Sequence, residues 1–177
     1  AAITALNKGV ALAGAMHNTG EGGLSTYHRS GGDLILQIGT GYFGCRAEDG
    51  HLDLDKLVTV VESAPVRAIE IKLSQGAKPG LGGMLPGDKV TPEIAAIRGV
   101  PVGQDVASPS RHSAFNSVDS MLDVVEEIAA LVDLPLSRVR VVAPDPGGGF
   151  GGKQNPRFEP LLAHLALRTG RTCRLVL

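Results

Sequence analysis

One loop of the sequence, KLSQGAKPGLGGM, carries two lysines, an amide and several glycines within a few residues. Lys72 lies at the end of a predicted strand, and Gln75 and Lys78 follow it directly. The lysines supply positive charge and the amide can orient a ligand, while Gly76 and the glycines after it let backbone N–H groups approach closely. This combination predicts a site for a doubly negative ligand. A solvated glycine- and proline-rich surface loop is the alternative interpretation.

A second glycine-rich loop, PDPGGGFGGKQ at residues 144–154, matches two nucleotide-binding patterns incompletely. Gly147, Gly149 and Gly152 fit the dinucleotide fingerprint, but the strand that follows offers no acid about 20 residues further on. A P-loop would need Ser or Thr where Gln154 stands, because that hydroxyl binds Mg²⁺. A glycine-rich turn that caps a helix explains the loop more simply.

The spacing of apolar residues predicts the helices and strands that must position these loops. Helices are expected over 2–16, 53–64 with Asp53 as N-cap, 91–98, from Ser117 onward and after Asn155. Strands are expected over 34–38, 67–74, 104–108, 138–144 and 173–177. Alternation of the two indicates an α/β fold with parallel pairing. In such folds ligands bind beyond the carboxyl ends of the strands, where the loop after Lys72 begins.

Composition excludes several classes of function. The chain has 177 residues, 43% hydrophobic and 20% charged, with a net charge of −1, which gives no general electrostatic case for nucleic acid. No apolar run reaches the roughly 20 residues that a membrane span needs. Cys45 and Cys173 are too few for a zinc ribbon, an iron–sulfur site or a disulfide framework. These features predict a cytoplasmic protein with no metal site and no nucleic-acid or membrane partner.

The histidines are scattered along the sequence, without metal-ligand spacing. His112, beside Ser113 and with Asp119 nearby, offers the residue types of a catalytic triad. We interpret this stretch instead as a surface loop followed by a helix cap.

Three stretches of residues 1–129 resemble the FMN-binding domain of glutamate synthase, in particular its stand-alone bacterial and archaeal relatives. They are HNTGEGG, IGTGYFGCR and IEIKLSQGAKPGLGGMLPGDKVTPEIAAIRGVP, in the family's order. The resemblance implies a TIM-type (β/α)₈ barrel that binds FMN and reduces the 2-iminoglutarate formed from 2-oxoglutarate and ammonia. Leu81 and Met84 stand where full-length synthases usually have Glu and Gln, which favours the stand-alone subfamily.

The same resemblance implies roles for single residues. Lys72, Gln75 and Lys78 would be catalytic and would lie at the flavin and at the carboxylates of 2-oxoglutarate. Gly76 would bind the cofactor in the same loop, and Glu21 and Arg46 would lie in neighbouring loops of the same face. A cation near N1 of the flavin would stabilise the reduced ring.

Residues 134–177 resemble a different family, the molybdopterin-binding subunit of xanthine dehydrogenase and aldehyde oxidase. The resemblance covers LPLSRVRVVAPDPGGGFGGKQNPRFEPLLAHLALRTGRTCRLVL and implies that Phe150 and Gly151 lie near the pterin and the metal ligands. The family's catalytic glutamate would fall beyond Leu177. We therefore expect a boundary near Ala129–Asp133, with a partial (β/α) TIM-type barrel over 1–129 and a short α/β segment of molybdenum-hydroxylase type over 130–177.

Three functions are compatible with this pattern. A complete (β/α)₈ barrel takes about 250 residues. The first function is therefore an FMN-dependent oxidoreductase in partial form, which a partner subunit or a homo-oligomer would complete. The second is a fragment of a molybdopterin-dependent hydroxylase. The third is a non-catalytic hybrid or truncated chain.

Overall fold

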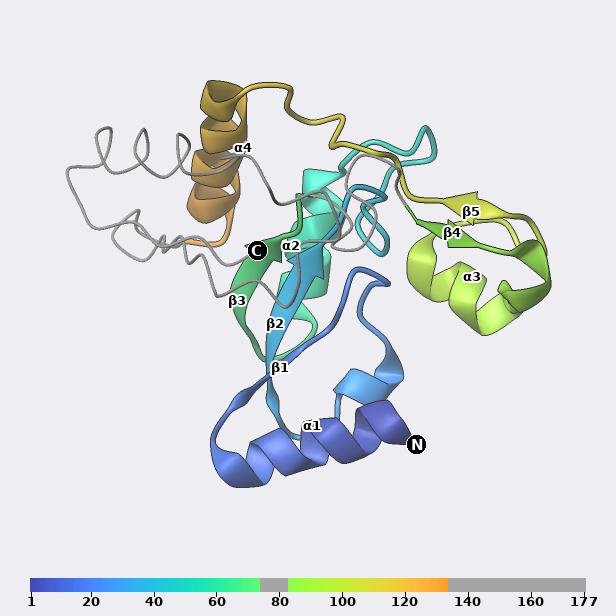
Figure 1. Ribbon diagram of the computed structural model, residues 1–177. Helices are drawn as coiled ribbons and strands as arrows, with labels where there is room; N and C mark the ends of the chain where they lie inside the picture. Colours follow the sequence, from blue (N-terminus) through green and yellow to red (C-terminus); the bar gives the residue numbers. More distant parts are fainter. Residues whose placement is uncertain (74–82, 134–177) are drawn as a thin grey trace, which may run out of the picture.

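A parallel three-stranded sheet in the order β1-β2-β3 lies at the centre of the fold (Figure 1). The computed structural model describes residues 1–73 and 83–133. The strands are β1 (Met16–Asn18), β2 (Asp33–Ile38) and β3 (Val66–Ile71). Alternation along β2 buries Leu34, Leu36 and Ile38 on one face of the sheet. The pairing register sets Ile69 beside Leu36 and Ile71 beside Ile38, so β3 adds its apolar side chains to the same face.

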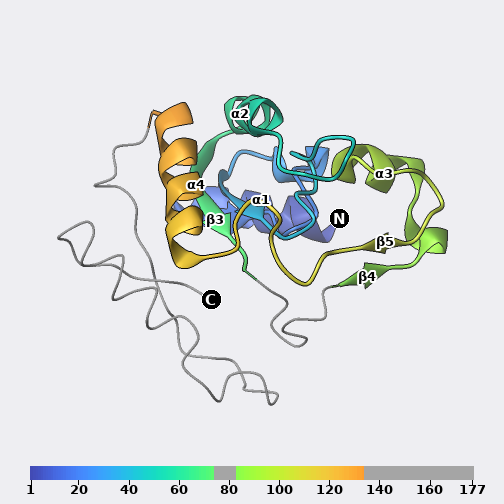
Figure 2. The ribbon, with the colours of Figure 1, turned by 90° about the horizontal axis from the view of Figure 1, so that it is seen from above.

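Two helices cover this apolar face, α2 (Leu54–Glu62) and α4 (Val118–Leu131) (Figure 2). Leu57 of α2 and Ile128 of α4 belong to the same core cluster as the strand residues. Each helix begins at a side-chain cap: Asp53 accepts a hydrogen bond from the backbone N–H of Lys56, and Ser117 forms a capping box with Ser120. Because β2 and β3 pair in parallel, α2 is the crossover helix that connects them.

The first helix, α1 (Ala2–Ala13), runs below the amino ends of the strands (Figure 1). Asn7 is fully buried there, and its side-chain oxygen accepts hydrogen bonds from the backbone N–H groups of Ser30 and Gly32. These bonds tie α1 to the start of β2.

A smaller lobe lies beside the sheet, at the right of Figure 1. It consists of the antiparallel pair β4 (Met84–Leu85) and β5 (Val106–Ala107) with α3 (Pro92–Arg98). Its core cluster includes Phe43, Val90 and Val106. Because Phe43 belongs to the loop after β2, that loop joins the lobe to the sheet.

Several expected elements are confirmed, with shorter bounds. The expected helix over 2–16 ends at Ala13, because Gly14 adopts a left-handed conformation with φ 62° and Met16 already begins β1. The strand expected over 67–74 ends at Ile71, and the one expected over 104–108 is reduced to β5. β4 was not predicted, because a two-residue strand has no periodicity. The strands and helix expected after residue 133 lie outside the described residues.

The mixed α/β class with parallel strands is confirmed. Within residues 1–73 and 83–133 the parallel sheet has three strands and does not close, so the assignment of these strands to a partial TIM-type barrel stays a prediction. None of the helices in the described part of the chain is long and apolar enough to cross a membrane.

Candidate functional site

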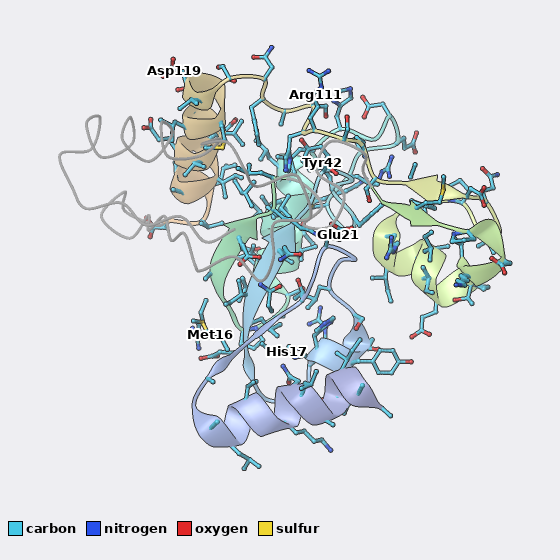
Figure 3. All side chains as sticks on the ribbon, in the orientation of Figure 1. Met16, His17, Glu21, Tyr42, Arg111 and Asp119 are labelled. Carbon is cyan, nitrogen blue, oxygen red and sulfur yellow. The ribbon has the colours of Figure 1, made fainter. Side chains whose placement is uncertain are left out.

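The loops that follow β1, β2 and β3 meet at the carboxyl end of the sheet. An ion pair joins the loop after β1 to the loop after β3: the Glu21 carboxylate lies 2.8 Å from the Lys72 ammonium. Both side chains are partly buried, with 29% and 22% of their surface exposed. Figure 3 shows Glu21 beside the upper ends of the strands, the ends toward which they run. An ion pair at this edge places charge where ligands of α/β folds bind.

Gly39 provides the space that Glu21 occupies. It follows β2, and a Cβ at this position would lie 2.8 Å from Cβ of Glu21 and 3.1 Å from its Oε2. Such distances are shorter than ordinary van der Waals contacts, so any larger residue would push the Glu21 carboxylate away from Lys72. The loop after β2 therefore contributes to the site because Gly39 has no side chain and leaves room for Glu21.

A polar cluster on the second face of the sheet orients the loop that carries Glu21. Glu70 accepts hydrogen bonds from the amide nitrogens of Asn18, at 3.1 Å, and of Gln37. The amide oxygen of Asn18 in turn accepts from the backbone N–H of Gly20 at 2.9 Å. Because both ends of the Asn18 amide are bonded, its orientation is fixed. Glu70 thus fixes the turn that immediately precedes Glu21.

Tyr42 and His112 form a second connection, which reaches the backbone of Lys72. His112 is 4% exposed and Tyr42 is 1% exposed. The imidazole Nδ1 lies 3.1 Å from the Tyr42 hydroxyl, and Nε2 lies 2.8 Å from the carbonyl oxygen of Lys72. The hydroxyl also accepts from the backbone N–H groups of Ser113 and Ala114, both at 3.1 Å.

The expected loop and helix cap are confirmed, since Arg111 and Ser113 are exposed and Ser117 caps the helix that follows, but His112 itself is buried, which a surface loop did not predict. The buried contacts join residues 70 positions apart, which no local pattern reveals. The only hint in the sequence is a large aromatic residue, Tyr42, inside the glycine-rich stretch IGTGYFGCR. Burial lowers the pKa of His112, and its hydrogen bond to the Lys72 backbone opposes this shift.

Arg46 lies in the loop after β2, as expected. Its guanidinium carbon is 5.8 Å from the centre of the Phe43 ring, and that of Arg98 is 4.6 Å from the same centre. A Cβ on Gly50 would lie 2.6 Å from a guanidinium nitrogen of Arg46. These contacts place Arg46 beside the smaller lobe, and its role at a cofactor stays a prediction.

The structure thus brings together Glu21 and Lys72 of the predicted site residues. Gln75, Gly76 and Lys78 lie outside the described residues, as do Phe150 and Gly151, so their roles stay predictions. Within the described residues, no group of three or more His, Cys, Asp or Glu side chains could hold a metal ion. Cys45 is buried, and burial, with a smaller contribution from Asp53, raises its pKa to about 12, so its thiol does not ionise near neutral pH.

Comparison with known proteins identifies the family to which the chain belongs. The family described as the conserved region in glutamate synthase matches residues 1–143. The chain belongs to the glutamate synthase family. The match includes every residue of the Glu21–Lys72 pair and of the Tyr42–His112 connection.

Relatives in this family are longer than the chain. The glutamate synthase large subunit-like protein YerD of Bacillus subtilis is 42% identical over 147 residues, which are 82% of this chain and 28% of that protein. The archaeal-type glutamate synthase [NADPH] of Thermotoga maritima is 36% identical over 154 residues, 83% of this chain and 28% of that protein. The chain therefore spans about a quarter of the length of these curated relatives.

The family match ends at residue 143, beyond the boundary expected near Ala129–Asp133. That boundary stays a prediction, and so does the resemblance of residues 134–177 to a molybdopterin-binding subunit.

Proposed function

We propose that this chain forms part of an FMN-dependent oxidoreductase that converts 2-oxoglutarate and ammonia to glutamate. The observation that carries the proposal is the Glu21–Lys72 ion pair, which joins two loops at the carboxyl end of a parallel sheet. Membership of the glutamate synthase family supports the same reaction class.

The residues at this edge fit a flavin and a dicarboxylate. Lys72 offers a partly buried cation, which attracts an anion more strongly than a fully solvated one. Gly39 leaves the space that the Glu21 side chain occupies. Together with Gln75 and Lys78, Lys72 would hold the flavin and the substrate carboxylates. When bound, FMN would supply the two electrons that reduce an imine.

The chain's own side chains would then have distinct tasks. Reduction of 2-iminoglutarate adds a hydride to carbon and a proton to nitrogen. An imine that binds already protonated carries that proton with it, so the substrate needs a cation at its carboxylate and a hydrogen-bond acceptor for its N–H groups. Lys72 would bind the carboxylate. Glu21, 2.8 Å from that cation, would accept hydrogen bonds from the nitrogen of ammonia or of the protonated imine.

The proposal also concerns the rest of the molecule. Because β1 and β3 are the edge strands of the described parallel sheet, we propose that further residues of a longer polypeptide, or a partner subunit, pair with them. The length of the relatives supports this view. Location in the cytoplasm stays a prediction.

The test uses the protein that contains this chain, purified with any flavin it retains. Lys72→Met is compared with Lys8→Met, a change on the exposed side of α1. We expect Lys72→Met to raise the KM for 2-oxoglutarate about tenfold or more, because a charge-assisted contact is lost. Flavin absorbance and glutamate formation with a chemical reductant are the measurements. Unchanged flavin content and KM in Lys72→Met would refute the proposal.

A further inference from the structure

We propose that Tyr42 and His112 are positioning residues that fix the backbone at Lys72 and thereby aim its ammonium at the substrate. This inference rests on the proposed function, since it assigns the pair a purpose in the same site. His112 contacts Lys72 through the Lys72 backbone carbonyl, and Tyr42 acts through its hydrogen bond to His112.

The hydrogen-bonding groups determine the protonation state of the pair. A carbonyl oxygen can only accept a hydrogen bond. Nε2 of His112 must therefore carry a hydrogen and donate a hydrogen bond to the backbone carbonyl of Lys72. In a neutral imidazole Nδ1 is then an acceptor, and the Tyr42 hydroxyl donates to it. The hydroxyl oxygen accepts from two backbone N–H groups, those of Ser113 and Ala114. Every polar atom of the pair is satisfied in one arrangement only, so the pair is rigid.

This arrangement fixes Lys72 from both sides. Its backbone N–H donates to the carbonyl of Ile38 in the neighbouring strand at 2.8 Å, and its carbonyl accepts from His112 at 2.8 Å. The residue therefore stays in register with β2 at the point where the chain leaves the sheet. Only its side chain extends into the site, toward Glu21.

Backbone strain at Tyr42 indicates that the arrangement has a function beyond packing. Tyr42 has φ 49°, a left-handed conformation that costs a bulky residue about 1 kcal/mol or more. The strain is held by contacts on several sides. The backbone N–H of Tyr42 donates to the carbonyl of Gly39, and its carbonyl accepts from the N–H of Cys45, both at 3.0 Å, while its hydroxyl bonds to His112. Strained residues held in this way are typical of preorganised sites.

Two amide substitutions separate the two bonds of the imidazole. The side-chain nitrogen of Gln can occupy the place of Nε2, so His112→Gln keeps a donor for the Lys72 carbonyl. The shorter Asn side chain reaches only the place of Nδ1, so His112→Asn loses that donor. His51→Asn, at an exposed histidine, is the matched control.

In the flavin-loaded protein that contains this chain, we expect His112→Asn to raise the KM for 2-oxoglutarate about tenfold to a hundredfold, with a smaller change in kcat. His112→Gln should recover most of the loss, whereas His51→Asn should have no effect. Equal KM values for His112→Asn and the unmodified protein would overturn the inference. If His112→Asn leaves KM unchanged while Lys72→Met raises KM in the same assay, only the positioning role is overturned and the proposed function stands.

A spectroscopic measurement covers the case in which His112→Asn does not fold. In the unmodified protein labelled with ¹⁵N, we expect the His112 ring to be the neutral Nε2–H form, and its Nε2 signal to shift when 2-oxoglutarate is added to saturation. An Nδ1–H form, or a signal that stays unchanged at saturation, would overturn the inference.

Discussion

Glu21 and Lys72 come from loops 51 residues apart, and each holds the side chain of the other in place. Because both are partly buried, removal of one would leave the other as a poorly solvated charge. Under the proposed function, a dicarboxylate that binds Lys72 would compete with Glu21 and release it toward the substrate nitrogen. At the scale of single residues, the pair is a structural contact to which we also assign the chemistry of the proposed site.

The size of residue 39 should control this pair. In Gly39→Ala the new methyl group would lie 2.8 Å from Cβ of Glu21, so we expect Glu21 to shift and the protein to lose about 1–3 kcal/mol of stability. The KM for 2-oxoglutarate should rise as well. Chemical denaturation and steady-state kinetics are the measurements.

Gly9→Ala is the matched control, because nothing lies within 4 Å of a Cβ at that helical position. It should stabilise the protein by about 0.5–1 kcal/mol. Gly39→Ala with unchanged stability and kinetics would show that the loop adapts and that Gly39 is not required.

At the scale of elements, the loop after β1 depends on the polar cluster of Glu70. Asn18→Ala removes the acceptor of the Gly20 N–H and one donor to Glu70. We expect a loss of about 1–3 kcal/mol and faster amide hydrogen exchange at Gly20 and Glu21. Asn116→Ala, at an exposed position before α4, is the control. Exchange rates that remain those of the unmodified protein would mean that the loop is held by other contacts.

Elements whose ends are marked by local chemistry could be predicted from the sequence. Asp53 and Ser117 cap the helices that follow them, and Gly99 ends α3 in a left-handed conformation. These signals act within one helical turn, so a single sequence contains them.

The site itself could be predicted only in part. Family resemblance predicted that Glu21 and Lys72 lie in neighbouring loops of one face, but it did not predict the ion pair between them, and spacing alone does not bring two distant loops together. The buried connection between Tyr42 and His112 was missed, because it depends on how the chain folds back over 70 residues. Short strands such as β4 carry too few residues for any periodicity.

At the scale of the whole molecule, the described sheet has one covered face and one polar face. α2 and α4 cover the first, and the second carries Asn18, Gln37 and Glu70. The longer relatives have room to provide the strands that would close this sheet into a barrel, with the second face turned inward. The buried histidines connect this sheet to the segments around it.

Two of these histidines, His28 and His112, should make the fold sensitive to acid. Burial lowers the pKa of each below the ordinary 6.5, and the neighbouring His17 adds to the effect at His28. Between the lowered pKa and 6.5 the unfolded chain binds more protons than the folded one, so stability falls as the pH falls through this window. Above 6.5 both states are neutral and the penalty vanishes.

We therefore expect the Tm to be lower at about pH 5.5 than at about pH 7.5, with the decrease reduced in His112→Gln, which cannot be protonated. Differential scanning calorimetry at both pH values measures it, and His51→Gln, at an exposed histidine, should leave the decrease unchanged. A Tm that rises on acidification would contradict the assignment of neutral buried imidazoles. Protonation of Nδ1 would displace the Tyr42 hydroxyl as donor while Nε2 still donates to the Lys72 carbonyl, so the same acid treatment should loosen Tyr42 before it loosens the backbone at Lys72.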